Sequence, residues 1–361
     1  MSRVKGCLRQ SLRPSTPLVA VLSLAMVAGA GVVGTGSAVA ASKASAHRYT
    51  IGFSNPQGTQ PVLDEFQSVL TKAGAREGIT VKSLNAALTV GKQVSDIQQF
   101  INEKVKAIVV FPLAGPPLVP VLTAARKAGI PVLGYNAITT SKVTAAKIYP
   151  FTADINQNIV NEGAKLAAAF VAKKLKGKGN VLGVDIAAPV PSLHAFMASE
   201  QADVTRGHPG IHWLETVSDV TDNIAGAATP VADALTKYHG KVAAVMAYFD
   251  GAAIGASHSL KAAGVKAVVV GQQGNETGIT ALKKGEITAT IDIEPYNEGL
   301  IALTMVKDLV SGKKVPLVVT PPVTLITKQN LKSYVPWSKA LTEIAKGKLK
   351  PPTKLTAVAK A

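Results

Sequence analysis

The chain has 361 residues, of which 39 are Lys or Arg and 22 are Asp or Glu, giving a formal net charge of +17. This length is enough for two lobes that each bury a hydrophobic core. The one cysteine, Cys7, precedes a segment that we expect to be cleaved, so a disulfide or a thiolate metal site is excluded from the mature protein.

The excess of basic residues does not predict nucleic-acid binding. The lysines are spread over predicted helix faces and become denser between residues 339 and 361. No basic stripe interleaved with aromatic residues and no nucleic-acid motif accompanies them. We therefore expect a solvated basic surface against an anionic envelope, and no nucleic-acid partner.

The first 40 residues have the pattern of an export signal. Basic residues at positions 3–13 precede a small-residue apolar run at 18–33, and Ala38-Val39-Ala40 is typical of a cleavage site. An uncleaved membrane anchor is the alternative, but the run is short, rich in glycine and followed by this site. Because Cys7 precedes the apolar run, we expect an exported protein that is not a lipoprotein.

From residue 48 onward, short apolar runs alternate with segments of helical period. This alternation predicts an α/β fold with parallel sheets. The expected strands are 49–53, 80–83, 107–111, 130–134, 147–151, 180–185, 212–217, 242–248, 267–271 and 287–293, and the expected helices include 62–75, 95–104, 119–127, 156–174, 252–263 and 298–311.

Residues 105–136 have the pattern of one complete strand–helix–strand unit. Ligands of open parallel sheets lie outside the carboxyl ends of the strands, so Phe111, Tyr135 and Asn136 are expected at a binding site. The helix-end, glycine and strand-start pattern at 127–132 recurs at 261–270, which favours two related lobes.

Catalytic and metal chemistry is not indicated. His208 and His212 are four apart, but Pro209 and Gly210 between them prevent the helix that would bring them together. No nucleophile elbow, phosphate loop or dinucleotide fingerprint occurs. We therefore expect no enzyme, no metal and no cofactor.

Several segments together resemble the periplasmic sugar-binding proteins of ABC importers, of the ribose- and galactose-binding type. They are Tyr49-Thr-Ile-Gly-Phe-Ser, the strand and loop 107–112, Ala128-Gly-Ile-Pro-Val, Phe151-Thr-Ala-Asp, 247–256, Val268-Val-Val-Gly and Ala289-Thr-Ile. Their order and spacing carry the resemblance, which covers about residues 48–327.

The resemblance implies two doubly wound parallel-sheet lobes joined by a three-strand hinge that closes on a solute. Alignment with the resembled family places the three segments that cross between the lobes near 151–154, 292–294 and 319–322. The N-terminal lobe is then 48–150 plus 293–320, the C-terminal lobe is 151–292 plus 321–338, and 339–361 is a basic tail that we expect to be mobile from residue 346.

The ligand residues implied by the resemblance depart from the usual pattern. The first loop offers Gln57, Thr59 and Gln60, and the Asp-Arg pair after the strand ending at 134 is replaced by Asn136 and Ala137. The arginine that the resemblance implies aligns near Phe196, but the sequence does not fix the alignment of residues 186–200. Further positions are Phe249 in place of an Asn, the retained Asp250, Gln273 in place of an Asp, and Asn275.

This chain therefore lacks the charged Asp-Arg pair with which the resembled proteins bind sugar hydroxyls. Neutral amides and the faces of Phe111, Tyr135, Phe196, Tyr248 and Phe249 favour a neutral solute with more carbon surface than a free sugar. Core packing is the alternative for Phe196 and Tyr248, and a helix-capping role is the alternative for Asp250.

Two functions follow from the resemblance. The first is a monomeric capture subunit that delivers a small solute to the membrane permease of an ABC importer. The second is an extracellular sensor whose closed form is recognised by a receptor or histidine kinase. The export signal and the lack of a DNA-binding head disfavour an intracellular repressor.

Overall fold

The computed structural model describes residues 48–139 and 143–352, together with the backbone of 356–360. The predicted export signal lies outside the described residues. None of the described helices is long and apolar enough to span a membrane.

Two separate sheets form the framework. The first has the order β13-β11-β5-β4-β3-β1-β2, and all its strand pairs are parallel except β11 with β13. Its strands are β1 (Tyr49–Asn55), β2 (Ile79–Asn85), β3 (Ile108–Val110), β4 (Val132–Tyr135), β5 (Ala153–Ile155), β11 (Pro316–Thr320) and β13 (Thr356–Lys360).

The second sheet has the order β12-β10-β9-β8-β6-β7, and only β12 runs antiparallel to its neighbour. Its strands are β6 (Lys178–Ile186), β7 (Gly210–Asp219), β8 (Ala244–Ala247), β9 (Val268–Gln273), β10 (Ala289–Asp292) and β12 (Thr324–Ile326). The prediction of an α/β fold with two parallel-sheet lobes is confirmed.

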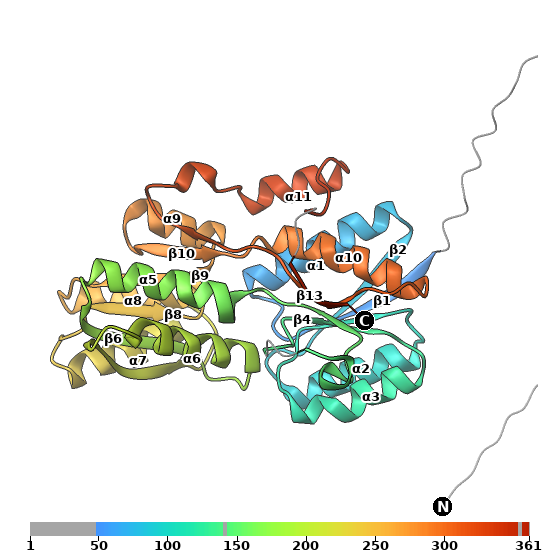
Figure 1. Ribbon diagram of the computed structural model, residues 1–361, viewed down its shortest axis with the longest axis horizontal. Helices are drawn as coiled ribbons and strands as arrows, with labels where there is room; N and C mark the ends of the chain where they lie inside the picture. The colour runs from blue at the N-terminus through green and yellow to red at the C-terminus, as the bar shows by residue number, and fades with distance from the viewer. Residues whose placement is uncertain (1–47, 140–142, 353–355, 361) are drawn as a thin grey trace, which may run out of the picture. The chain divides into compact units, whose positions relative to one another are not determined.

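Helices cover both faces of the first sheet (Figure 1). On one face, α1 (Pro61–Arg76) and α10 (Pro295–Val310) pack together, and α11 (Trp337–Ala345) lies against both. Gly299 permits this approach, since a Cβ there would lie 2.7 Å from Val69. The other face carries α2 (Val90–Asn102), η1 (Pro116–Leu118) and α3 (Val119–Lys127), and the short α4 (Ala145–Ile148) precedes β5.

The second sheet is also covered on both faces. The π-helical turn η2 (Ile159–Gly163), α5 (Ala164–Lys174) and α6 (Pro191–Thr205) pack on one side. On the other side lie α7 (Ile224–Lys237), α8 (Asp250–Ala262) and α9 (Glu276–Lys284), and η3 (Leu331–Ser333) follows β12. Such burial on both faces explains why most strands read as continuous apolar runs.

The chain crosses between the lobes at four places. The first crossing follows β5 at 156–158, so the predicted boundary near 150 is wrong, as is the strand predicted at 147–151, where α4 lies. The next two crossings are at 293–294 and 321–323. A fourth, at 327–336, returns the chain from β12 to α11, which packs on α1 and α10.

The predicted basic tail at 339–361 adds secondary structure to the first lobe, and the mobility expected from residue 346 is wrong at β13. Trp337 is only 4% exposed, and the Arg76 guanidinium of α1 donates a hydrogen bond to the Ala345 carbonyl at 3.1 Å. Farther on, β13 adds a strand to the edge of β11. An amphipathic helix and an edge strand thus complete the first lobe.

Candidate functional site

A cavity lies between the two lobes, at the carboxyl ends of the strands of both sheets. Its empty volume is about 460 Å³, part of which is open to solvent. The lining residues are Pro56, Gln57, Gln60, Val62, Leu63, Leu88, Phe111, Gln157, Ile186, Val190, Leu193, Asp222, Tyr248, Gln272, Gln273 and Ile293.

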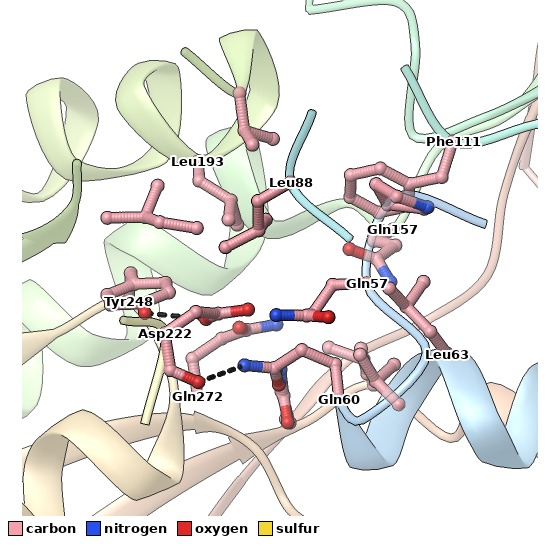
Figure 2. A pocket seen from close by; sticks show the side chains of 16 residues that line it. Gln57, Gln60, Leu63, Leu88, Phe111, Gln157, Leu193, Asp222, Tyr248 and Gln272 are labelled. Atoms are coloured by element: carbon pink, nitrogen blue, oxygen red, sulfur yellow. Dashed lines mark hydrogen bonds between the residues drawn. The ribbon is translucent and has the colours of Figure 1, made fainter. Parts of the chain in front are cut away.

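The polar and apolar side chains occupy different parts of the cavity. Figure 2 shows the polar ends of Gln57, Gln272 and Asp222 gathered near its centre, with Leu88 and Leu193 on one side. Amides can donate and accept hydrogen bonds, whereas the leucines contribute only carbon surface. The arrangement suits a small molecule that has both polar groups and an apolar face.

Gln60 connects the two lobes across the cavity wall. Its side-chain amide donates to the Asp222 carbonyl oxygen at 3.1 Å, and its Oε1 accepts from Gln273 Nε2 at 3.4 Å. Gln60 is also the N-cap residue of α1, but its side chain makes no capping hydrogen bond. The side chain is therefore free to join the first lobe to the second.

The loop after β7 is held in an unusual backbone conformation. Asp222 has a φ of 55°, a left-handed value that Asp tolerates better than most residues. The Asp219 carboxylate accepts from the backbone N–H groups of Thr221, Asp222 and Asn223 at 3.0, 2.9 and 3.0 Å. These three bonds fix the loop and aim Asp222 toward the cavity.

The Asp222 carboxyl has an altered acidity. Burial raises its pKa to about 6, while the hydrogen bonds from Tyr248 and Gln60 lower it and the nearby Asp219 raises it further. The Tyr248 hydroxyl donates to Asp222 Oδ1 at 2.7 Å and lies 3.1 Å from Asp219 Oδ2. At neutral pH the cavity therefore contains an ionised carboxylate.

Behind the cavity, Gln157 belongs to a buried hydrogen-bond network. Its Nε2 donates to the Tyr135 hydroxyl at 3.0 Å, and its Oε1 accepts from Asn136 Nδ2 at 2.9 Å. Tyr135 in turn donates to Glu298 Oε2 at 2.5 Å, and burial raises the pKa of Glu298 to about 8. Gln157 thus contributes a positioned wall whose amide is already hydrogen-bonded.

The structure places the predicted site residues in three groups. Gln57, Gln60, Phe111 and Gln273 line the cavity. A second hollow, which Gln60 and Asp222 also border, is lined by Thr59, Phe249 and Asn275. The others, Tyr135, Asn136, Phe196 and Asp250, line neither cavity.

The last group has structural contacts instead. The Tyr135 ring stacks on Phe66 with centroids 3.9 Å apart, and Phe196 is fully buried in the core. Asn136 bonds to Gln157, as described above. Asp250 accepts hydrogen bonds from the Asn275 N–H at 2.9 Å and the Thr290 hydroxyl at 2.5 Å, so it holds the loop before α9.

Several cavity residues were not predicted as site residues. Asp222 and Gln157 lie on a loop and a crossover whose paths the sequence pattern does not fix. The apolar Leu88, Val190 and Leu193 carry no sequence signal for ligand contact. Tyr248, whose face the sequence did offer to a solute, reaches the cavity from the end of β8 while its hydroxyl is bonded to Asp222. Within the described residues, no group of three His, Cys, Asp or Glu side chains is arranged to hold a metal ion.

Comparison with known proteins identifies the class. Residues 51–314 match the family described as the periplasmic binding protein domain, and the chain belongs to this family. It is 26% identical to the ribose import binding protein of Bacillus subtilis (strain 168) over 287 residues, which are 78% of this chain and 88% of that protein. The sugar-binding resemblance is thus confirmed.

Two further proteins are similar. The xylitol-binding protein of Mycolicibacterium smegmatis is 28% identical over 242 residues, 65% of this chain and 66% of that protein. An ABC transporter solute-binding protein of Actinobacillus succinogenes 130z, solved with bound D-allose, has a TM-score of 0.71 and 21% identity, covering 80% of this chain and all of that one. At this identity, the solved structure shows the fold alone.

Proposed function

We propose that this protein is an exported solute-binding protein of an ABC importer, which captures a small neutral solute between its lobes and delivers it to a membrane permease. The observation that carries the proposal is the cavity, to which both lobes contribute amide side chains and apolar surface. Family membership and the ribose import relative support the same class.

The lining chemistry supports a sugar-like or more apolar solute. Gln57 and Gln272 offer donors and acceptors for hydroxyl groups, while Phe111 and the leucines offer surface to a ring or carbon chain. Neutral hydrogen bonds contribute about 0.5–1.5 kcal/mol each, so several must act together with apolar contact.

Delivery to a permease requires that the two lobes close around the solute. The crossovers near 157, 293 and 322 are short connections of the kind that act as hinges, and Gln60 supplies contacts made only when the lobes meet. We propose that the working unit is a monomer, with no cofactor.

A thermal-shift screen tests the proposal. Ribose, xylitol, D-allose, myo-inositol, nucleosides and aromatic metabolites serve as probes, because a ligand of the native state raises the melting temperature with its concentration. A concentration-dependent rise with one class supports capture. If no probe in the screen raises the melting temperature, the proposed solute class is wrong.

Uptake separates delivery from sensing. Deleting the gene should abolish uptake of the radiolabelled probe that binds tightest. If uptake continues and only a transcriptional response to the probe is lost, the importer role is wrong and the sensor role replaces it.

A further inference from the structure

Asp222 is the one acidic or basic side chain among the described residues that line the cavity. All other polar groups there are amides or the Tyr248 hydroxyl. Although the chain has a net charge of +17, the described lining residues include one carboxylate and no Lys, Arg or His where the solute is proposed to bind. This contrast makes Asp222 the dominant electrostatic feature of the site.

The carboxylate of Asp222 is only partly satisfied by the protein. Oδ1 accepts the Tyr248 hydroxyl at 2.7 Å, and a hydrogen bond from the Gln60 side chain also lowers the pKa of the carboxyl. The residue is 8% exposed, so bulk water reaches it poorly. A carboxylate has about four lone-pair sites, so it can accept a further hydrogen bond from a solute beside those from the protein.

The position of the carboxylate is fixed from both lobes. Asp219 accepts the Asp222 N–H at 2.9 Å, and the Gln60 amide donates to the Asp222 carbonyl at 3.1 Å. The Asp219 hydrogen bonds lie within one lobe, so they hold the backbone in its left-handed conformation whether or not the lobes meet. Such a positioned acceptor discriminates between ligands, because a ligand that cannot match it leaves the acceptor unpaired.

We propose that Asp222 is the specificity-determining residue of the cavity, where its carboxylate accepts a hydrogen bond from a hydroxyl or amino group of the solute and excludes solutes with an acidic group at that position. The proposal rests on the proposed function. An acidic group there would meet the Asp222 carboxylate in a cavity whose other described lining residues are uncharged, so no Lys or Arg among them would offset the repulsion.

Matched probe sets test this role. Each set contains a neutral sugar, its amino sugar and its uronic acid: glucose, glucosamine and glucuronate, then galactose, galactosamine and galacturonate. Calorimetric titration compares the wild type with Asp222→Asn and with Asp233→Asn. Asp233 is an exposed residue of α7, so its variant removes the same charge outside the cavity.

In the wild type, the uronate should bind at least about tenfold more weakly than its neutral or amino partner. Asp222→Asn should weaken binding of the neutral or amino sugar about ten- to a hundredfold, the range for a hydrogen bond to a charged group. The difference in affinity between that sugar and its uronate should therefore become smaller. Asp233→Asn should bind as the wild type does. The melting temperature of free Asp222→Asn should stay near that of the wild type, since Asn can still accept from Tyr248.

Two results would overturn the proposal in different ways. If Asp222→Asn keeps the wild-type affinities and ratios, or weakens all three members equally, Asp222 does not select the solute, although the proposed function stands. If no member of either set binds any of the three proteins, the proposed sugar-like solute class is itself wrong and the role of Asp222 falls with it.

Discussion

Replacing Gln60 with Ala should weaken solute binding without destabilising the free protein. The side chain makes two contacts with the second lobe, at 3.1 Å to Asp222 and at 3.4 Å to Gln273. A neutral hydrogen bond contributes about 0.5–1.5 kcal/mol and the second contact is long, so the loss should be about 1–2 kcal/mol. Since these contacts join the lobes only when they meet, the loss should appear in affinity.

Calorimetric titration with the tightest probe of the screen measures this loss. The dissociation constant of Gln60→Ala should rise about five- to thirtyfold. Its free melting temperature should change little, because the Gln60 side chain makes no capping bond to α1. Gln98→Ala, on the exposed face of α2, is the matched control and should bind normally. Equal affinity of Gln60→Ala and wild type would refute the role of Gln60 in joining the lobes.

The remaining predictions concern export, pH, the C-terminal helix and closure. Mass spectrometry of the secreted or envelope protein should give an N-terminus at Ala41 or a few residues on; intact chains in the membrane would contradict export. Burial raises the folded-state pKa of Asp292 and Glu298 to about 8 each, above their unfolded values. The folded protein therefore binds protons more tightly than the unfolded chain, and this stabilisation is lost as the pH rises. The melting temperature of the free protein should fall from pH 5 to pH 8, and a rise over this range would contradict the assignment. Trp337→Ala should lower the free energy of unfolding in urea by about 3–5 kcal/mol, and Trp213→Ala should lower it clearly less because Trp213 is only half-buried. Equal losses for the two variants would mean that α11 does not stabilise the lobe. Small-angle scattering should show a smaller radius of gyration at saturating probe, and an unchanged profile would argue for a rigid binder.

Most of the strand and helix order up to residue 311 could be predicted from the sequence because most buried parallel strands are continuous apolar runs, whereas β11, β12 and β13 were not predicted. The failures came where tertiary contacts decide. The run at 147–151 looks like a strand, yet Thr144 caps α4 through a hydrogen bond from the Lys147 N–H, and β5 begins only at Ala153. Near the C-terminus, the surface that α11 meets on α1 and α10 cannot be read from the sequence.

The candidate site could be predicted only as a set of strand ends. Phe111 and Gln273 follow strands whose ends face the cavity, and both line it. Tyr135 also ends a strand, but its ring is packed behind the cavity between Phe66 and Phe111, with centroids 3.9 and 5.4 Å away. Asp222 was not predicted because its loop conformation depends on Asp219. No local sequence pattern indicates that three backbone N–H groups donate to the Asp219 carboxylate.

The central claim is that one solute binds in the cavity between the lobes. Leu193 lies on the apolar side of this cavity and is partly exposed to it, so Leu193→Trp should fill the space without disturbing the core. Val220, which is 70% exposed, provides the control Val220→Trp. Titration with the tightest probe should give one solute per chain for the wild type and Val220→Trp and no binding for Leu193→Trp. Wild-type binding by Leu193→Trp would contradict the claim.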